Sequence, residues 1–198
     1  MKLPILALIL AAAPASTHAA ILYSGLQNIG ITNSFTSVYV DVDAVSSGLT
    51  QATGWDLDAF FGGEAFGNSI NFQPARQSVA VNSAILRLNI GAVVDSSRNY
   101  WNAEAGSSTH IGAGSGQFTS GAEGYLGFKL VDNSAAGPYF GWMRVNFSNT
   151  GGTGTIIDWA YENTSGTAIT VGAIPEPTSV LLLGLGSVLC ALRRRRGA

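Results

Sequence analysis

Two pairs of aspartates are the residues whose type and spacing could do chemistry. One residue separates Asp41 from Asp43, and one separates Asp56 from Asp58. On a β-strand this spacing places both carboxylates of a pair on one face, roughly 7 Å apart. Because hard oxygen ligands suit Ca²⁺, we take Asp56 and Asp58 as candidate calcium ligands. The glycine and the bidentate glutamate of an EF-hand loop are missing, so outward-facing strand carboxylates that bind nothing remain the alternative.

Tryptophan is the other residue type that could form a binding site, because its flat ring can support a sugar. Trp55, Trp101, Trp142 and Trp159 are the four in the chain. Trp101 stands between Tyr100 and Asn102 in a polar segment, so we take it as the candidate sugar-binding residue. A core position is the alternative, since aromatic side chains dominate the cores of β-sandwiches.

The sequence contains no recognisable combination of residues that would form a catalytic site. The two histidines are His18, in the N-terminal segment, and His110, in a Gly/Ser-rich stretch where we expect it to be exposed and idle. No Gly-x-Ser-x-Gly elbow occurs, and a single histidine without a neighbouring cysteine makes a poor zinc site. We therefore expect no catalytic residue, no cofactor other than Ca²⁺, and a protein that is not an enzyme. A secreted hydrolase that uses His110, Asp56 and Asp58 is the alternative.

The elements that must position these residues are β-strands. Apolar and polar residues alternate in short runs separated by Gly, Ser, Asn and Thr, and no window shows a helical stripe. This pattern predicts an all-β fold, an antiparallel β-sandwich resembling a jelly roll. The predicted strands cover residues 37–43, 77–82, 84–94, 125–131, 139–147, 156–161 and 168–171.

The N-terminal segment, residues 1–19, has the features of a secretory signal peptide. Lys2 supplies the positive start, residues 3–15 are nearly all apolar, and small residues precede Ala20. We expect export through the Sec translocon and cleavage between Ala19 and Ala20. An N-terminal membrane anchor is the alternative, but the apolar run is shorter than the roughly 20 residues of a spanning helix.

The segment between the two ends, residues 20–173, is predicted to be the exported domain. Up to Ile174 it carries eleven acidic and five basic residues, a net charge of −6. A domain with this negative charge has no overall positive charge with which to bind the phosphates of a nucleic acid, and it is repelled by an anionic membrane surface. The single cysteine of the chain, Cys190, lies outside this segment, so burial of a core must stabilise the domain.

The C-terminal segment, residues 174–198, has three parts in order. Pro175, Glu176 and Pro177 come first, an apolar stretch over residues 178–192 follows, and a basic cluster ends the segment. Fifteen helical residues span roughly 22 Å, less than a hydrocarbon core of about 30 Å, but snorkelling arginines and local thinning of the bilayer make up such a deficit. We therefore expect a short transmembrane helix over residues 178–192. A basic cluster holds its end of a helix on the cytoplasmic side. The cluster consists of Arg193, Arg194, Arg195 and Arg196.

This layout resembles the PEP-CTERM sorting signal of Gram-negative bacteria. Residues 124–129, 139–145 and 158–162 are also similar to strand segments common in proteins that carry the signal. The resemblance implies processing near Pro175–Pro177 by an exosortase, a membrane-embedded transpeptidase. It also implies a transient stay in the inner membrane, followed by the cell envelope, the cell surface or the extracellular space. A plain tail anchor is the alternative.

These features together predict a non-catalytic protein of the cell surface or extracellular matrix. The resemblance further implies an association with exopolysaccharide and biofilm. A recognition module that binds carbohydrate or calcium is the main alternative.

Overall fold

The computed structural model describes residues 20–131, 137–149 and 151–175. No helix occurs among them, so no described helix could cross a membrane. The predicted signal peptide at residues 1–19 lies outside the described residues. So do Glu176, Pro177, the predicted transmembrane helix at 178–192 and the arginine cluster at 193–196. The described chain is all-β with antiparallel sheets, which confirms that part of the predicted fold class and is consistent with a β-sandwich.

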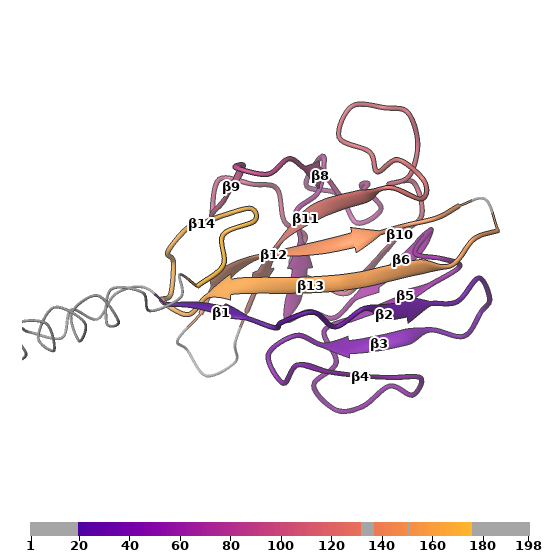
Figure 1. The fold of residues 1–198 in the computed structure, drawn as a ribbon. Helices are drawn as coiled ribbons and strands as arrows, with labels where there is room; N and C mark the ends of the chain where they lie inside the picture. The colour runs from indigo at the N-terminus through magenta and orange to yellow at the C-terminus, as the bar shows by residue number, and fades with distance from the viewer. Residues whose placement is uncertain (1–19, 132–136, 150, 176–198) are drawn as a thin grey trace, which may run out of the picture.

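The larger sheet, here called the central sheet, is built on three long antiparallel strands that lie side by side in Figure 1. They are β11 (Glu123–Leu130), β12 (Tyr139–Asn146) and β13 (Gly154–Glu162). Short strands complete its two edges. These are β1 (Ile21–Tyr23) and β2 (Ile29–Ile31) against β13, and β7 (Phe72–Pro74) and β8 (Arg87–Leu88) against β11.

The second sheet, here called the outer sheet, has five short strands in the order β10-β6-β5-β3-β4. All of its pairs are antiparallel. The strands are β3 (Val38–Asp41), β4 (Ser46–Gly48), β5 (Leu57–Phe60), β6 (Ala65–Asn68) and β10 (Ala105–Ser107).

The main core lies between these two sheets, because each contributes one apolar face. Val38 and Val40 of β3 and Leu126 and Phe128 of β11 follow the period of two that a strand requires, and all are buried. On β13 a register shift opposite Arg144 and Val145 interrupts the period. This irregularity lets the strand place both Ile156 and Trp159 in the main core despite their odd spacing. The Trp159 indole then donates to the Val42 carbonyl at 2.9 Å, which ties the two sheets together.

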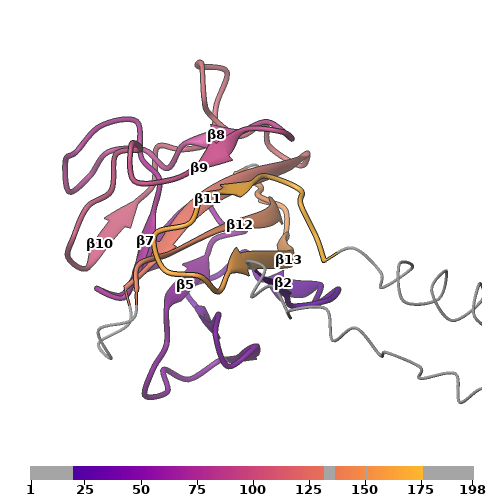
Figure 2. The ribbon, with the colours of Figure 1, turned by 90° about the vertical axis from the view of Figure 1, so that its left-hand side faces the viewer.

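The central sheet is covered on its other face as well. A small ladder of β9 (Val93–Val94) and β14 (Ile169–Thr170) packs there in a second apolar cluster. Figure 2 shows β9 on one side of β11 and β12 and β5 on the other. The Trp142 indole in this cluster donates to the Ala173 carbonyl at 2.9 Å, so the last residues of the domain are held against the sheet.

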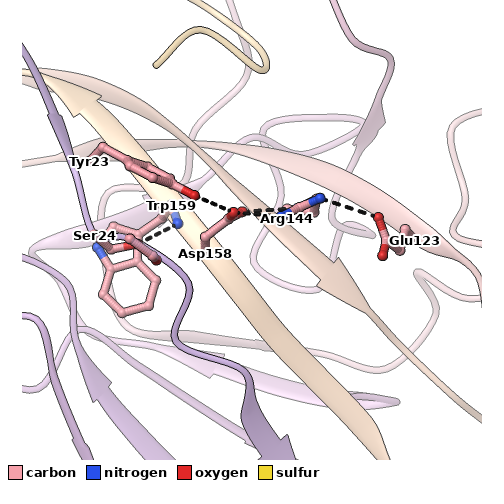
Figure 3. Close-up of polar contacts among 7 residues, drawn as sticks. Tyr23, Ser24, Glu123, Arg144, Asp158 and Trp159 are labelled. Atoms are coloured by element: carbon pink, nitrogen blue, oxygen red, sulfur yellow. Dashed lines mark hydrogen bonds and ion pairs between the residues drawn. The ribbon is translucent and has the colours of Figure 1, made fainter. Parts of the chain in front are cut away.

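One buried carboxylate lies on this same face, at the junction of three strands (Figure 3). Asp158 of β13 is only 2% exposed and accepts two hydrogen bonds from the Arg144 guanidinium, at 3.0 and 2.6 Å. The Tyr23 hydroxyl donates a further bond at 2.8 Å. Glu123 reaches Arg144 from β11 at 3.6 Å. Because burying a carboxylate is costly unless it is paired, this network fixes β1, β12 and β13 in one register.

Two of the predicted strands are wrong, and in both places the chain turns. Residues 77–82 form a turn, closed by bonds from the Gln77 amide to the Ala84 carbonyl and from the Ser78 amide to Ser83 Oγ. The run 84–94 is broken by Gly91 at φ +85°, and only the two short strands β8 and β9 lie within it. The predicted strands nearest the C-terminus are confirmed as β11, β12, β13 and β14.

Candidate functional site: an acidic pocket at the end of the sandwich

Three aspartates meet at the end of the sandwich where β3 and β13 finish and β12 begins (Figure 1). Each of Asp41, Asp43 and Asp56 offers one carboxylate oxygen, and these oxygens lie within 4.8 Å of one another. They line a cavity of about 490 Å³, here called the acidic pocket. Its other wall comes from the central sheet, with Leu130 of β11 and Tyr139 of β12 among its residues.

Strand pairing and a tight turn bring the three carboxylates together. The β3–β5 register pairs Val40 with Leu57, which puts Asp56 next to the end of β3. Asp56 Oδ2 accepts a hydrogen bond from the Val42 amide at 2.8 Å. Asp41 Oδ1 accepts one from the Ala44 amide at 2.9 Å, which folds the turn that carries Asp43. The aspartate side chains thus build the turn as well as the pocket.

Burial and mutual repulsion make the ionised form of this cluster costly. Asp56 is 4% exposed; burial raises its pKa to about 7, and the charges of Asp43 and Asp41 add to the shift. Burial likewise raises the pKa of Asp41 to about 6, with a contribution from its contact with Asp43. No lysine or arginine lines the pocket among the residues described. A cation that neutralises the carboxylates would therefore be favoured.

The donor set fits a hard cation. Asn71 and Asn163 also line the pocket, and amide oxygens are ligands of the type that Ca²⁺ accepts. The Asn163 Oδ1 atom accepts a hydrogen bond from the Ala20 amide at 3.2 Å. The sequence suggested Asp56 together with Asp58, but Asp58 is not in the cluster. It lies farther along β5, accepts a hydrogen bond from Ser37 Oγ at 3.3 Å and lines a different hollow.

His110 is fully buried, so the expectation that it is exposed is wrong. Its Nε2 lies 2.7 Å from the Gly63 carbonyl and its Nδ1 lies 3.1 Å from Ser107 Oγ. Burial lowers its pKa to about 4, so at neutral pH the ring is uncharged and Nε2 donates to the carbonyl. Neither ring nitrogen is bonded to an aspartate, and the structure does not bring His110 together with Asp56 and Asp58 as a catalytic set.

Trp101, the candidate sugar-binding residue, is half-buried. Its indole nitrogen is buried, and within the described part of the chain it has no hydrogen-bond partner. Trp142 and Trp159 are core residues. Trp55 is half-buried and lines the hollow that also contains Asp58.

The end of the domain leads directly into the C-terminal segment. Ala173 makes the hydrogen bond to Trp142, Ile174 is half exposed, and Pro175 is the last residue described. Residues 173–196 match the family described as the PEP-CTERM protein-sorting motif. The chain carries a PEP-CTERM sorting signal. The match begins at the last residue that the domain holds and covers Pro175, Glu176, Pro177 and the arginine cluster.

The PEP-CTERM signal implies processing by exosortase, a membrane enzyme, and export to the cell envelope or surface. The matched residues agree to within two positions with the segment 174–198 predicted from the sequence. No curated protein matches the chain, and no solved structure matches it either.

Proposed function

We propose that this protein is a non-catalytic component of the cell surface or extracellular matrix, associated with exopolysaccharide. The observation that carries the proposal is the PEP-CTERM signal that follows directly on an all-β domain. The buried, uncharged His110 supports the non-catalytic part, because it is the one histidine of the exported segment and is poorly placed to act as a general base.

Fractionation of the producing cell tests this role. The protein should be recovered with the extracellular or envelope polysaccharide. In a strain that makes no exopolysaccharide, it should shift to the culture medium. Recovery in the inner membrane of both strains would contradict the proposal.

A calcium-binding recognition module is the second candidate, favoured by the three carboxylates of the acidic pocket. Extracellular calcium modules bind with a Kd of about 0.1–1 mM, so 10 mM Ca²⁺ should stabilise the fold by about 1.4–2.7 kcal/mol. The Tm of the wild type should rise with Ca²⁺, and the rise should be lost in Asp43→Asn. Asp58→Asn is the matched control, because it removes a β5 carboxylate outside the pocket. Equal Ca²⁺ effects on the Tm of both variants would exclude this site.

A further inference from the structure

A second hollow crosses the outward face of the outer sheet, away from the acidic pocket. It has a volume of about 780 Å³ and runs over β5, β6 and β10. Its axis follows one row of cross-strand partners, since Asp58 pairs with Gly67 and Gly67 pairs with Gly106. Trp55 lies at one side, and Asn82 and Glu104 contribute polar groups. We call this hollow the sheet groove.

Glycine makes the floor of the sheet groove low. A Cβ on Gly67 would collide with the Asp58 carboxylate, so only glycine lets that carboxylate lie along the floor. At Gly106 the nearest atom to an added Cβ is 4.0 Å away, so the floor is open there. Both glycines expose backbone where ordinary strand residues would project side chains outward. Glycine in a strand weakens the sheet, and such positions often mark the close approach of a ligand.

An aromatic ring and hydrogen-bonding groups flank this floor. Tyr39 packs edge-on against Trp55, with ring centroids 5.7 Å apart and planes at 86°, which fixes the orientation of the indole. The Asp58 carboxylate accepts one long side-chain hydrogen bond, from Ser37 Oγ at 3.3 Å, and a contact from its own backbone amide, so it retains acceptor capacity for a ligand. Flat rings pack against the C–H face of a pyranose, while carboxylates and amides bond its hydroxyls.

The charge of the sheet groove selects among polysaccharides. Asp58 and Glu104 line it, and no basic side chain does so among the residues that the structure describes. A uronic acid or a sulfated sugar would meet two like charges without compensation. We propose that the sheet groove binds a segment of an uncharged hexopyranose polysaccharide, stacked on Trp55 and hydrogen-bonded to Asp58. This inference rests on the proposed function in assigning the domain to a polysaccharide layer, and it names the residues that make the contact.

Binding of defined oligosaccharides to the purified exported protein tests the sheet groove. The probes are cellohexaose, laminarihexaose and mannohexaose, with oligogalacturonic acid as the acidic comparison, and affinity is measured by titration calorimetry. At least one neutral hexaose should bind, and the acid should not. Trp55→Ala should weaken binding at least about tenfold through loss of the stacking surface. Asp58→Asn keeps the shape of the side chain and should weaken binding about fivefold.

Phe35→Ala is the matched control, because Phe35 is an 85% exposed aromatic residue that does not line the groove. Its affinity should equal that of the wild type, and circular dichroism should show all three variants folded. Failure of the folded wild type to bind any neutral hexaose would overturn the proposal. Unchanged affinity in both Trp55→Ala and Asp58→Asn would also overturn it, as would tighter binding of oligogalacturonic acid than of the neutral hexaoses. A wild-type dimer that Trp55→Ala abolishes would overturn it too, because the sheet groove would then be an interface between copies of the chain. The affinity of the purified protein does not depend on its location in the cell, so a failure of the fractionation experiment is distinguishable from a failure here.

Discussion

His110 shows how a single ionisable residue can be structural in this domain. Its ring lies against three phenylalanines, with centroids 5.2 Å from Phe147, 6.1 Å from Phe118 and 6.4 Å from Phe66. Its Nδ1 is hydrogen-bonded to Ser107 at the end of β10, and its Nε2 is hydrogen-bonded to Gly63 in the turn between β5 and β6. The histidine therefore fills a core position while both of its polar atoms remain hydrogen-bonded.

Acidification should destabilise the protein through His110. Burial lowers its pKa in the fold to about 4 from an ordinary 6.5, so between these values the unfolded chain binds more protons. The contribution of the neutral His110 to the free energy of unfolding is fully present above pH 6.5, and it falls by about 3 kcal/mol as the pH drops to 4. Urea unfolding of the wild type and His110→Gln from pH 7 to pH 4 measures this. The free energy of unfolding of the wild type should fall relative to that of His110→Gln as the pH drops over this range. If the two free energies of unfolding instead change with pH in parallel, the histidine does not titrate with folding.

The two carboxylates around Arg144 should differ strongly in their effect on stability. Asp158→Ala removes the buried partner and should lower the free energy of unfolding by about 2–3 kcal/mol, because the Arg144 and Tyr23 bonds are lost together. Glu123→Ala removes a partner whose side chain is 60% exposed and should cost less than about 0.5 kcal/mol. Equal losses in urea unfolding would contradict the assignment of Asp158 as the central residue of the network.

The acidic pocket was only partly foreseeable from the sequence. The Asp-x-Asp spacing pointed to the correct residue type and to Asp56, but it paired Asp56 with its neighbour in the chain. The structure instead pairs it across strands, because the β3–β5 register and the turn after Asp41 set the contact. Spacing within one strand carries no information about register between strands, so the cluster with Asp41 and Asp43 could not be chosen over the pair with Asp58.

At the scale of elements, β12 passes close to its neighbours because one of its residues has no side chain. A Cβ on Gly141 would collide with the Phe128 ring of β11 and lie 2.7 Å from the Ala160 carbonyl of β13. The three long strands therefore depend on this glycine for their tight packing.

Gly141→Ala should lower the free energy of unfolding by about 1–3 kcal/mol through overpacking. Gly30→Ala in β2 is the matched control, since nothing lies within 4 Å of the added Cβ. That change should be neutral or slightly stabilising. Denaturant midpoints of the two variants measure the difference, and a neutral Gly141→Ala would mean that the ring moves aside without cost.

The long strands were predictable, whereas of the short strands only some, such as β3 and β14, were predicted. The runs that became β11, β12 and β13 are eight or nine residues long and rich in aromatic and β-branched residues. The strands β5, β6, β7 and β10 have three or four residues each, and pairing with neighbours rather than their own pattern defines them. Within residues 84–94, Leu88 and Val94 lie in the second apolar cluster, whereas Ile85 lies in the main core. Ile90 is exposed just before the turn at Gly91, so the alternating sequence does not form one strand.

At the scale of the whole molecule, the folded domain and the sorting signal meet without a spacer. Ala173 is bonded to the central sheet through Trp142, and the matched PEP-CTERM residues begin at that same position. Because the acidic charge of the domain repels an anionic leaflet, we expect the C-terminal segment to supply the attraction to the membrane. We therefore propose that the processing enzyme works close to the surface of the domain.

Replacement of Pro175, Glu176 and Pro177 by alanine tests the central claim most directly. The measurement is the intact mass and the cell fraction of the protein in its native host. Exosortase processing predicts a shortened wild-type protein in the envelope or outside the cell, and a variant that keeps its C-terminus and accumulates in the inner membrane. Asn89→Ala, on the exposed surface of the domain, should behave as the wild type. A triple variant with the mass and location of the wild type would contradict the account.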